Sequence, residues 1–482
     1  MSTPPDCDVI VHGLGPFCGM KRILSIIAAI GIILFFTARY YESTIARRLP
    51  VVRNGAPCDF LPYYQAAQHI VHGESPFLAD GYIYPPLLAF LLTPLALLDY
   101  VAARIVWFAL SQLFLVASAV LLWRSFGRDW ASACLIAFVW AFGGAAGEAL
   151  AVGQVGPLLM LLIVVALCCR RSQRGAGVAL GFALKLFPGL LGLAVVFRGE
   201  RRAVRTMIST ALVAVLLPWV TVAVFLRGPL GFTKGSAWAG TPATLSWSLP
   251  SVVLRLLDPA GRSYLLPRNW MLGTNLEHFR LPFALTAAGL AIALLTLGAG
   301  LFALTRSAGF RLREGQVRWA MAALVPLALV ASPVAWTHYQ VLQYPGVALL
   351  LIYTWRQRQW VQLIIVLALA ALIYPIPIHV LDAFPRAYHD GSSLSSLYIW
   401  TSVTPAASLG LFGMFVRRAG KAARSANPSM LIQGQLHRFP VSRVPVFTTS
   451  EGRRIENPVA SRTTTQLPVG SFRSSEIRGG TP

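Results

Sequence analysis

Long apolar runs, separated by short polar segments, recur along the first 416 positions of the chain. They are rich in Leu, Ala and Val, and they contain the Gly and Pro residues that membrane helices tolerate. A spanning helix needs about 20 mostly apolar residues. The runs cover residues 23–37, 86–98, 102–122, 131–149, 155–169, 176–197, 206–226, 281–304, 319–332, 341–354, 360–376 and 400–416. This pattern predicts an all-α polytopic membrane protein with about 12 transmembrane helices.

Three stretches lack this apolar pattern. Residues 38–84 and 227–280 are long and contain many polar and aromatic residues, and loops beyond about 12–15 residues are usually functional or disordered. Residues 419–482 are rich in Ser, Thr, Arg and Pro, which is typical of a disordered basic tail. We therefore expect a cytoplasmic segment at 1–20, a transmembrane domain at 21–418 with two long external loops, and a cytoplasmic tail.

Composition and charge support the membrane interpretation. Only 12% of the 482 residues are charged and 56% are hydrophobic, whereas soluble domains carry about 25% charged residues. The net charge of +23 would suggest nucleic acid in a soluble protein. Here the basic residues lie mostly in short loops and in the tail, as the positive-inside rule predicts, so we expect no nucleic-acid partner. None of the six cysteines shows metal-ligand spacing, and no metal site is expected.

The charge rule is satisfied in the second half of the chain and violated in the first. After residue 198, every basic cluster falls on one side of the predicted membrane. Before it, five spans would leave three arginines outside: Arg170, Arg171 and Arg174. If 176–197 is a hairpin broken at 185–188, both its ends are cytoplasmic, but another span must then be miscounted. The sequence leaves both topologies open.

The first external segment carries an acidic residue beyond the first predicted helix. Asp59 is followed by Tyr63 and Tyr64, and the segment returns to the membrane at a di-proline. A carboxylate beside aromatic side chains at a membrane face could act on a substrate there. The alternative is an N-cap, because a helix is predicted to begin near Leu61. Both interpretations remain open from the residues alone.

A second candidate lies in the turn between two late apolar runs. Trp336 and His338 follow Ser332 and Pro333 there, and His338 can donate a hydrogen bond or carry charge near neutral pH. Aromatic residues are also ordinary at membrane interfaces, so a simple anchor is the alternative.

Polar residues inside apolar runs form a third group. Glu148 and Gln154 lie near the end of a run, where interfacial snorkelling is an alternative to function. Lys185 is central in its run, and ionisable residues within membranes are usually functional. Of the cations in the second external loop, Arg255 is the best placed to hold a phosphate.

Taken in order, these motifs resemble glycosyltransferase family 87, polyprenol-phosphate-mannose-dependent mannosyltransferases of the GT-C superfamily. The matching pieces are Asp59-Phe60 with Tyr63-Tyr64 and Ala66, Tyr84-Pro85-Pro86 with Pro94-Leu95, Gly153-Gln154, Gly181 with Lys185 and Pro188, Ser248 to Arg255, and Ser332-Pro333 with Trp336 and His338. The resemblance depends on the whole set of these motifs in this order, and not on any one of them. One departure is Tyr339, where many relatives have a second histidine. The resemblance implies a GT-C-type bundle in which residues 21–418 form the catalytic domain.

The chemistry implied by the resemblance is a single displacement at the anomeric carbon of a sugar. The donor would be a hexose, most simply mannose, on polyprenyl phosphate, and the acceptor an envelope glycolipid or glycan outside the cytoplasmic membrane. No cofactor is implied. By similarity, Asp59 is the general base that accepts the proton of the acceptor hydroxyl. One displacement predicts inversion of the anomeric configuration.

The remaining site residues also take their roles from the resemblance. The lipid phosphate gains negative charge as it leaves and needs fixed donors or cations, so His338 is expected as a second catalytic residue. The expected substrate-binding residues are Tyr63, Tyr64, Gln154, Lys185, Arg255 and Trp336. The two cations would face the phosphate, and the aromatic rings would orient the sugar.

A transporter or flippase of lipid-linked sugars is the main alternative. Lys185, Glu148 and the broken segment could line a substrate path. That function predicts inverted repeats, which are not visible, and it leaves the two external loops unexplained. A protein O-mannosyltransferase would usually carry an Asp-Glu pair where this chain has Asp59-Phe60.

Overall fold

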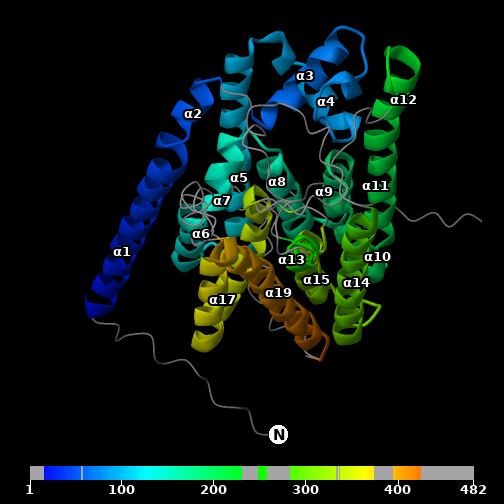
Figure 1. Cartoon of the computed structure of the whole chain (residues 1–482). Helices are drawn as coiled ribbons and strands as arrows, with labels where there is room; N and C mark the ends of the chain where they lie inside the picture. The colour runs from blue at the N-terminus through cyan, green and yellow to red at the C-terminus, as the bar shows by residue number, and fades with distance from the viewer. Residues whose placement is uncertain are drawn as a thin grey trace, which may run out of the picture. The chain divides into compact units, whose positions relative to one another are not determined.

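Figure 1 shows the computed structural model of the chain. It describes residues 16–55, 58–230, 248–257, 283–332, 335, 337–373 and 394–424. All of them belong to one unit of the chain, Met1–Gln435. The described part is helical, with one isolated β-bridge between Glu74 and Arg227 and no strand. The all-α prediction is therefore confirmed for these residues.

Most helices occupy the predicted apolar runs. The α-helices are α1 (Pro16–Tyr40), α2 (Leu49–Arg53), α3 (Phe60–Val71), α4 (Pro86–Leu92), α5 (Tyr100–Phe126), α6 (Trp130–Phe142), α7 (Gly144–Ala151), α8 (Gly156–Cys168), α9 (Arg171–Leu184), α10 (Leu191–Arg198), α11 (Arg201–Ala211), α12 (Leu217–Phe225), α13 (Leu249–Leu257), α14 (Phe283–Ala308), α15 (Glu314–Ala331), α16 (Tyr344–Arg356), α17 (Trp360–Ile373) and α19 (Leu394–Arg424). Two π-helical turns, η1 (Tyr41–Ala46) and η5 (Leu212–Leu216), and four 3-10 segments, η2 (Pro76–Leu78), η3 (Leu95–Leu97), η4 (Phe187–Leu190) and η8 (Thr337–Gln343), connect them.

Four described helices are long and apolar enough to cross a membrane: Leu24–Arg53, Tyr100–Phe126, Arg201–Phe225 and Ala287–Ala308. The pair α6 and α7, bent by 53°, makes a fifth if it is one span. Other predicted runs form shorter apolar helices, such as α8 and α17. The count of about 12 spans therefore stays a prediction. At its C-terminal end α19 continues past the predicted domain boundary at 418, and the rest of the tail lies outside the described residues.

The run 176–197 is a broken hairpin, as the second of the two topologies required. Helix α9 ends where Lys185 adopts extended backbone angles (φ −157°, ψ 129°), and η4 and α10 lead back. The two ends of the hairpin lie together, because Arg174 Nη1 forms a buried ion pair with Glu200 Oε2 at 3.2 Å. Lys185 consequently occupies the tip of the hairpin.

The run 86–98 forms no helix long enough to cross a membrane. Helix α4 within it has seven residues, about 10 Å of helix, which is too short to cross a bilayer. Pro94 follows and cannot continue the hydrogen bonding of the helix, so the chain makes the 3-10 turn η3 instead. Asp99 then caps the next long helix, α5, by accepting hydrogen bonds from the backbone of its first turn.

The two ends of helix α5 mark two ends of the bundle. It has 27 residues and is therefore about 40 Å long. Beyond its C-terminus, Asp129 pairs with Arg356 at the end of α16. At its N-terminus, Tyr100 stacks on Phe60 at the start of α3. These contacts between residues far apart in the sequence determine which loops lie at the same end of the bundle.

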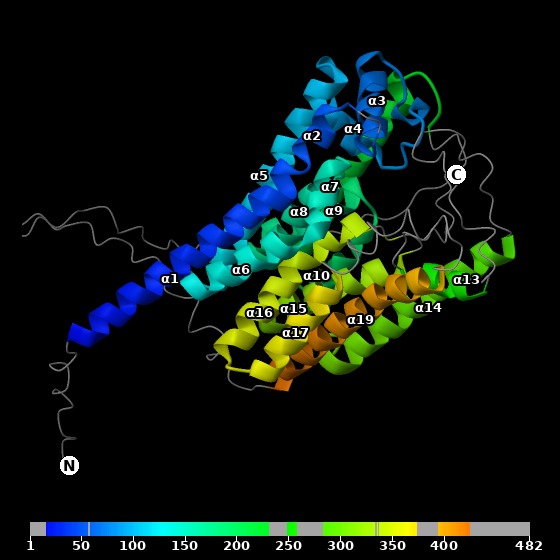
Figure 2. The same cartoon turned by 60° about the vertical axis from the view of Figure 1, so that its left-hand side comes forward.

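Helices α3 and α4 lie between the ends of α5 and α12 (Figure 1), and α2 joins them at the same end (Figure 2). The two long segments predicted to be external meet here. Ser75 N donates to Arg227 O at 2.8 Å, and Arg227 N donates to Gly73 O at 3.0 Å. This pairing ties the end of α12 to the first segment.

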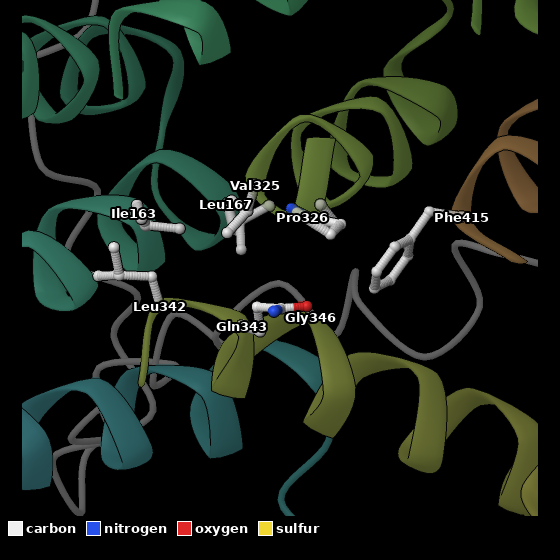
Figure 3. A pocket seen from close by; sticks show the side chains of 9 residues that line it. Ile163, Leu167, Val325, Pro326, Leu342, Gln343, Gly346 and Phe415 are labelled. Atoms are coloured by element: carbon white, nitrogen blue, oxygen red, sulfur yellow. The ribbon is translucent and has the colours of Figure 1, made fainter. Parts of the chain in front are cut away.

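The bundle core between α8, α15, α16 and α19 contains a void of about 10 Å³ (Figure 3). Its lining is almost wholly apolar, with Leu342 and Phe415 on opposite sides and Gln343 as the polar exception. A space of this size holds at most one water molecule. It is a packing feature and not a substrate site.

Candidate active site

Asp59 stands at the N-terminus of α3 but does not cap it. The residue occupies the N-cap position, yet its side chain makes no cap hydrogen bond. Its carboxylate Oδ2 accepts a hydrogen bond from Gln154 Nε2 instead. The next residue, Phe60, is fully buried, and its N–H donates to Val152 O at 3.1 Å. The N-cap alternative is therefore wrong for the side chain, which is directed at the turn between α7 and α8.

The turn that carries Gln154 depends on a glycine. Gly153 has φ +70°, in the left-handed region, and a Cβ there would lie 2.6 Å from Phe60 Cβ. Helix α5 holds the turn through two side chains: Trp107 Nε1 donates to Gly153 O, and Arg104 Nη2 donates to Ala151 O, each at 2.9 Å. The close approach of α3 thus places Asp59 against Gln154.

Gly153→Ala should destabilise the protein and impair any activity of this site. The left-handed backbone alone costs about 1–3 kcal/mol for a non-glycine residue, and the clash displaces Phe60. The measurement is the apparent melting temperature in detergent. Gly298→Ala on α14 is the matched control, because nothing lies within 4 Å of the added methyl group. Equal melting temperatures for the two variants would contradict the account of this turn.

The Gln154 amide links the carboxylate to two tyrosines. Its Oε1 lies 3.1 Å from the Tyr63 hydroxyl and 3.4 Å from the Tyr84 hydroxyl, and the two hydroxyls are 2.9 Å apart. A carboxylate only accepts hydrogen bonds, so it fixes the amide with its NH₂ group toward Asp59. The network is buried and orients the carboxylate from one side.

Lys185 reaches the same cluster from the tip of the hairpin. Its Nζ donates to the Tyr84 hydroxyl at 3.2 Å and lies 3.6 Å above the ring of Tyr339. A cation over an aromatic face is attracted to it, so the two rings hold the ammonium group in place. Tyr339, the residue that departs from the pattern of many relatives, is thus a support for Lys185.

His338 is buried beside this support. Its ring lies 4.4 Å from that of Tyr339, and its Nε2 has no hydrogen-bond partner in the described structure. Burial, and secondarily the charge of Lys185, holds the pKa of His338 well below its usual value. The imidazole is therefore neutral near pH 7 and available as a hydrogen-bond donor, while Lys185 is the nearby cation.

The electrostatics of Asp59 result from opposing effects. Burial raises the pKa of its carboxyl above the ordinary value, and the Gln154 hydrogen bond and the charge of Lys185 lower it. Burial prevails. A carboxylate with a raised pKa is a stronger base than an exposed one, which suits proton abstraction.

The structure brings together Asp59, Tyr63, Gln154, Lys185 and His338 from the predicted set. The Tyr64 hydroxyl is directed elsewhere and donates to Leu98 O at 2.7 Å, because consecutive helical residues face different directions. Arg255 is on α13, and its side chain, like Trp336, lies outside the described residues. No group of three metal-ligating side chains occurs in the described part.

Two members of the cluster were missed as site residues. Tyr84 had a signal in the sequence, because it directly precedes the di-proline that starts α4. The sequence signal for Tyr339 was weaker: this residue directly follows His338. Their role depends on contacts with Lys185 across about 100 positions or more, which the sequence alone does not reveal.

The family model of glycosyltransferase family 87 matches residues 82–333. A polyprenol-phosphate-mannose-dependent alpha-(1-2)-phosphatidylinositol mannoside mannosyltransferase of Mycobacterium tuberculosis is 28% identical over 321 residues, 62% of this chain and 69% of that protein. GPI mannosyltransferase 1 of Aspergillus oryzae is 30% identical over 146 residues, 29% of this chain and 35% of that protein. The chain therefore spans about a third of the fungal relative. No solved structure matches the chain.

The family match covers more than half of the chain. It includes Tyr84, Gln154 and Lys185, and the remaining members of the cluster, Asp59 and His338 among them, flank it on either side. The match agrees with the apolar membrane-length helices of the structure. The chain is a membrane glycosyltransferase and belongs to glycosyltransferase family 87.

Proposed function

We propose that the protein transfers mannose from a polyprenyl phosphate carrier to a glycolipid acceptor at the outer face of the cytoplasmic membrane. The observation that carries the proposal is the Asp59 carboxylate, held by Gln154 with the cation Lys185 nearby. A base and a cation that share one site suit a reaction that moves a proton and releases an anion. The donor and the class of acceptor are those for which the mannosyltransferase relatives are named.

The reaction is one displacement. Asp59 accepts the proton of an acceptor hydroxyl while its oxygen attacks the anomeric carbon of the mannose. The bond from that carbon to the phosphate oxygen breaks, and the polyprenyl phosphate leaves with the electron pair. Lys185 and the N–H of neutral His338 stabilise the charge that develops on the phosphate. Attack opposite the leaving group inverts the anomeric configuration.

The other cluster members position these groups. Gln154 and Tyr63 hold the carboxylate in one orientation, and Tyr84 and Tyr339 hold the ammonium group of Lys185. Preorganised groups need no rearrangement during the reaction, which is a large part of catalytic power. Arg255, from the second loop, and Trp336, from the late turn, contribute to substrate binding. Tyr64 is a packing residue.

The assignment of the active site to the outer face is based on the hairpin and the charge rule together. With 176–197 as a hairpin and 86–98 not crossing, Arg170, Arg171 and Arg174 share a side with the basic cluster after residue 198. Lys185, at the other end of α9, then lies toward the outer face with Asp59. This topology supports an active site on the outer side.

An apolar groove offers a place for the isoprenoid chain of the donor. It lies between α13, α14, α15 and α19, with a volume of about 440 Å³. Aliphatic side chains such as Leu295 and Leu327 line it, together with Phe412. Helix α15 leads from this groove to the turn that carries His338, so the phosphate end of a bound lipid would approach the cluster.

Transfer should fail at low pH, because the base must be ionised. Since the pKa of Asp59 is raised, activity should rise with pH through a value above that of an exposed aspartate, about 3.9. The pKa of His338 is lowered, so its imidazole is neutral near pH 7 and adds no transition there. A pH profile of kcat/KM checks this. The acid transition should persist in His338→Ala, and its disappearance there would contradict the assignment.

The proposal is tested by an assay of the purified full-length protein with radiolabelled polyprenyl-phosphate-mannose. Glycolipid acceptors, including phosphatidylinositol mannosides, are presented in mixed micelles. Transfer of label to one of them, with an α-linkage in the product, supports the function. A folded protein that transfers label to none, but moves the donor across liposome membranes, is a flippase instead.

A further inference from the structure

Two side chains outside the catalytic cluster carry buried polar atoms without partners. Glu148 lies on α7, and its Oε2 has no hydrogen-bond partner in the described structure. Arg48 directly precedes α2, and its Nε is likewise buried and unpaired. Both side chains are only half-buried overall, so they border accessible space. A buried polar atom without a hydrogen-bond partner costs free energy. Here two such atoms, one on an acidic and one on a basic side chain, lie in one region.

The two side chains are neighbours of each other and of Asp59. A Cβ on Gly147, the residue before Glu148, would lie 3.6 Å from Arg48 Nε. Arg48 and Asp59 are the two charged groups that interact electrostatically with the Glu148 carboxylate. Since Arg48 Nε and Glu148 Oε2 are both unpaired, they are not bonded to each other. Glu148 and Arg48 thus place two unpaired polar atoms near Asp59, the proposed base.

Two kinds of group lie near Asp59. Lys185 and the neutral His338 suit an anionic leaving group. Glu148 and Arg48 bring a carboxyl group and a guanidinium group with unpaired polar atoms. A neutral polyol suits these two side chains, because its hydroxyls can donate to a carboxyl oxygen and accept from a guanidinium group.

We propose that Glu148 and Arg48 bind hydroxyl groups of the sugar or polyol headgroup of the acceptor, and thereby present one hydroxyl to Asp59. This assignment rests on the proposed function and adds the acceptor side of the same site.

The test separates the KM of the acceptor from the KM of the donor in Glu148→Gln and Arg48→Gln. The probes are a phosphatidylinositol mannoside and polyprenyl-phosphate-mannose in mixed micelles. Loss of a charged hydrogen bond should raise the acceptor KM at least about 10-fold and leave the donor KM within about two-fold. Glu42→Gln and Arg47→Gln are matched controls, because these exposed neighbours pair with each other. Both controls should keep both KM values.

Two results would overturn the assignment. An unchanged acceptor KM in Glu148→Gln is the first. The second is a wild-type acceptor KM in the charge-swapped double variant Arg48→Glu with Glu148→Arg, which would mean that the two residues only pair internally. If Glu148→Gln melts well below the wild type, Glu148→Asp takes its place, with the same expected rise. If the wild type itself transfers no sugar, the proposed function fails first, so the two failures are distinguishable.

Discussion

Asp59→Asn is expected to lower kcat for sugar transfer by about 10²–10⁴-fold, the usual contribution of a general base, and to leave donor binding intact. The asparagine side chain has nearly the same shape but cannot take the proton of the acceptor hydroxyl. It can still hydrogen-bond to Gln154, so the turn and α3 should stay in place. The measurement is the kcat and donor KM of the purified variant.

Glu74→Gln is the control for this prediction. It removes the same charge from the same external segment, and Glu74 pairs with His69 away from the cluster. Its kcat should match the wild type. An Asp59→Asn variant with wild-type kcat would remove Asp59 from catalysis, and a large rise in donor KM with unchanged kcat would make it a binding residue only.

Lys185→Met is expected to lower kcat by about 10²–10³-fold, the typical loss when one group that stabilises developing charge is removed. Methionine keeps the length and apolar stem of lysine, so it removes the charge, the hydrogen bond to Tyr84 and the cation–π contacts while filling much of the same space. Lys185→Arg, which retains the charge, should recover part of the activity. The measurement is kcat at the pH optimum of each variant.

The Lys185 variant also has a consequence for the pH profile. The positive charge lowers the pKa of Asp59, so its loss should move the acid transition of Lys185→Met to higher pH. Lys185→Arg should keep the wild-type position. A variant with lost activity and an unmoved transition would contradict the coupling between the two groups.

Local signals in the sequence were enough to locate the helices and several site residues. Apolar runs predicted most of the α-helices, because the hydrocarbon of a bilayer requires apolar side chains along the whole length of a spanning helix. Lys185 was recognisable because charged groups are rare and costly within apolar runs. Asp59 was recognisable from its place beside two tyrosines beyond the first predicted helix. Pro188, three residues after Lys185, also marked the place where the hairpin breaks.

What the sequence could not settle depends on long-range packing. The sequence left open whether the run 176–197 folds back on itself, and the Arg174–Glu200 ion pair joins the two ends of the hairpin. Gln154 resembled an interfacial residue, and its contact with Asp59 spans 95 positions. Tyr63 and Tyr64 were equivalent in the sequence, and the rotation of α3 separates them.

The most direct test of the account is an experimental structure of the Asp59→Asn variant with polyprenyl-phosphate-mannose bound. The account predicts that the phosphate lies against Lys185 and His338, with the anomeric carbon of the mannose facing position 59. A phosphate bound at the opposite end of α9, beside Arg174, would contradict it.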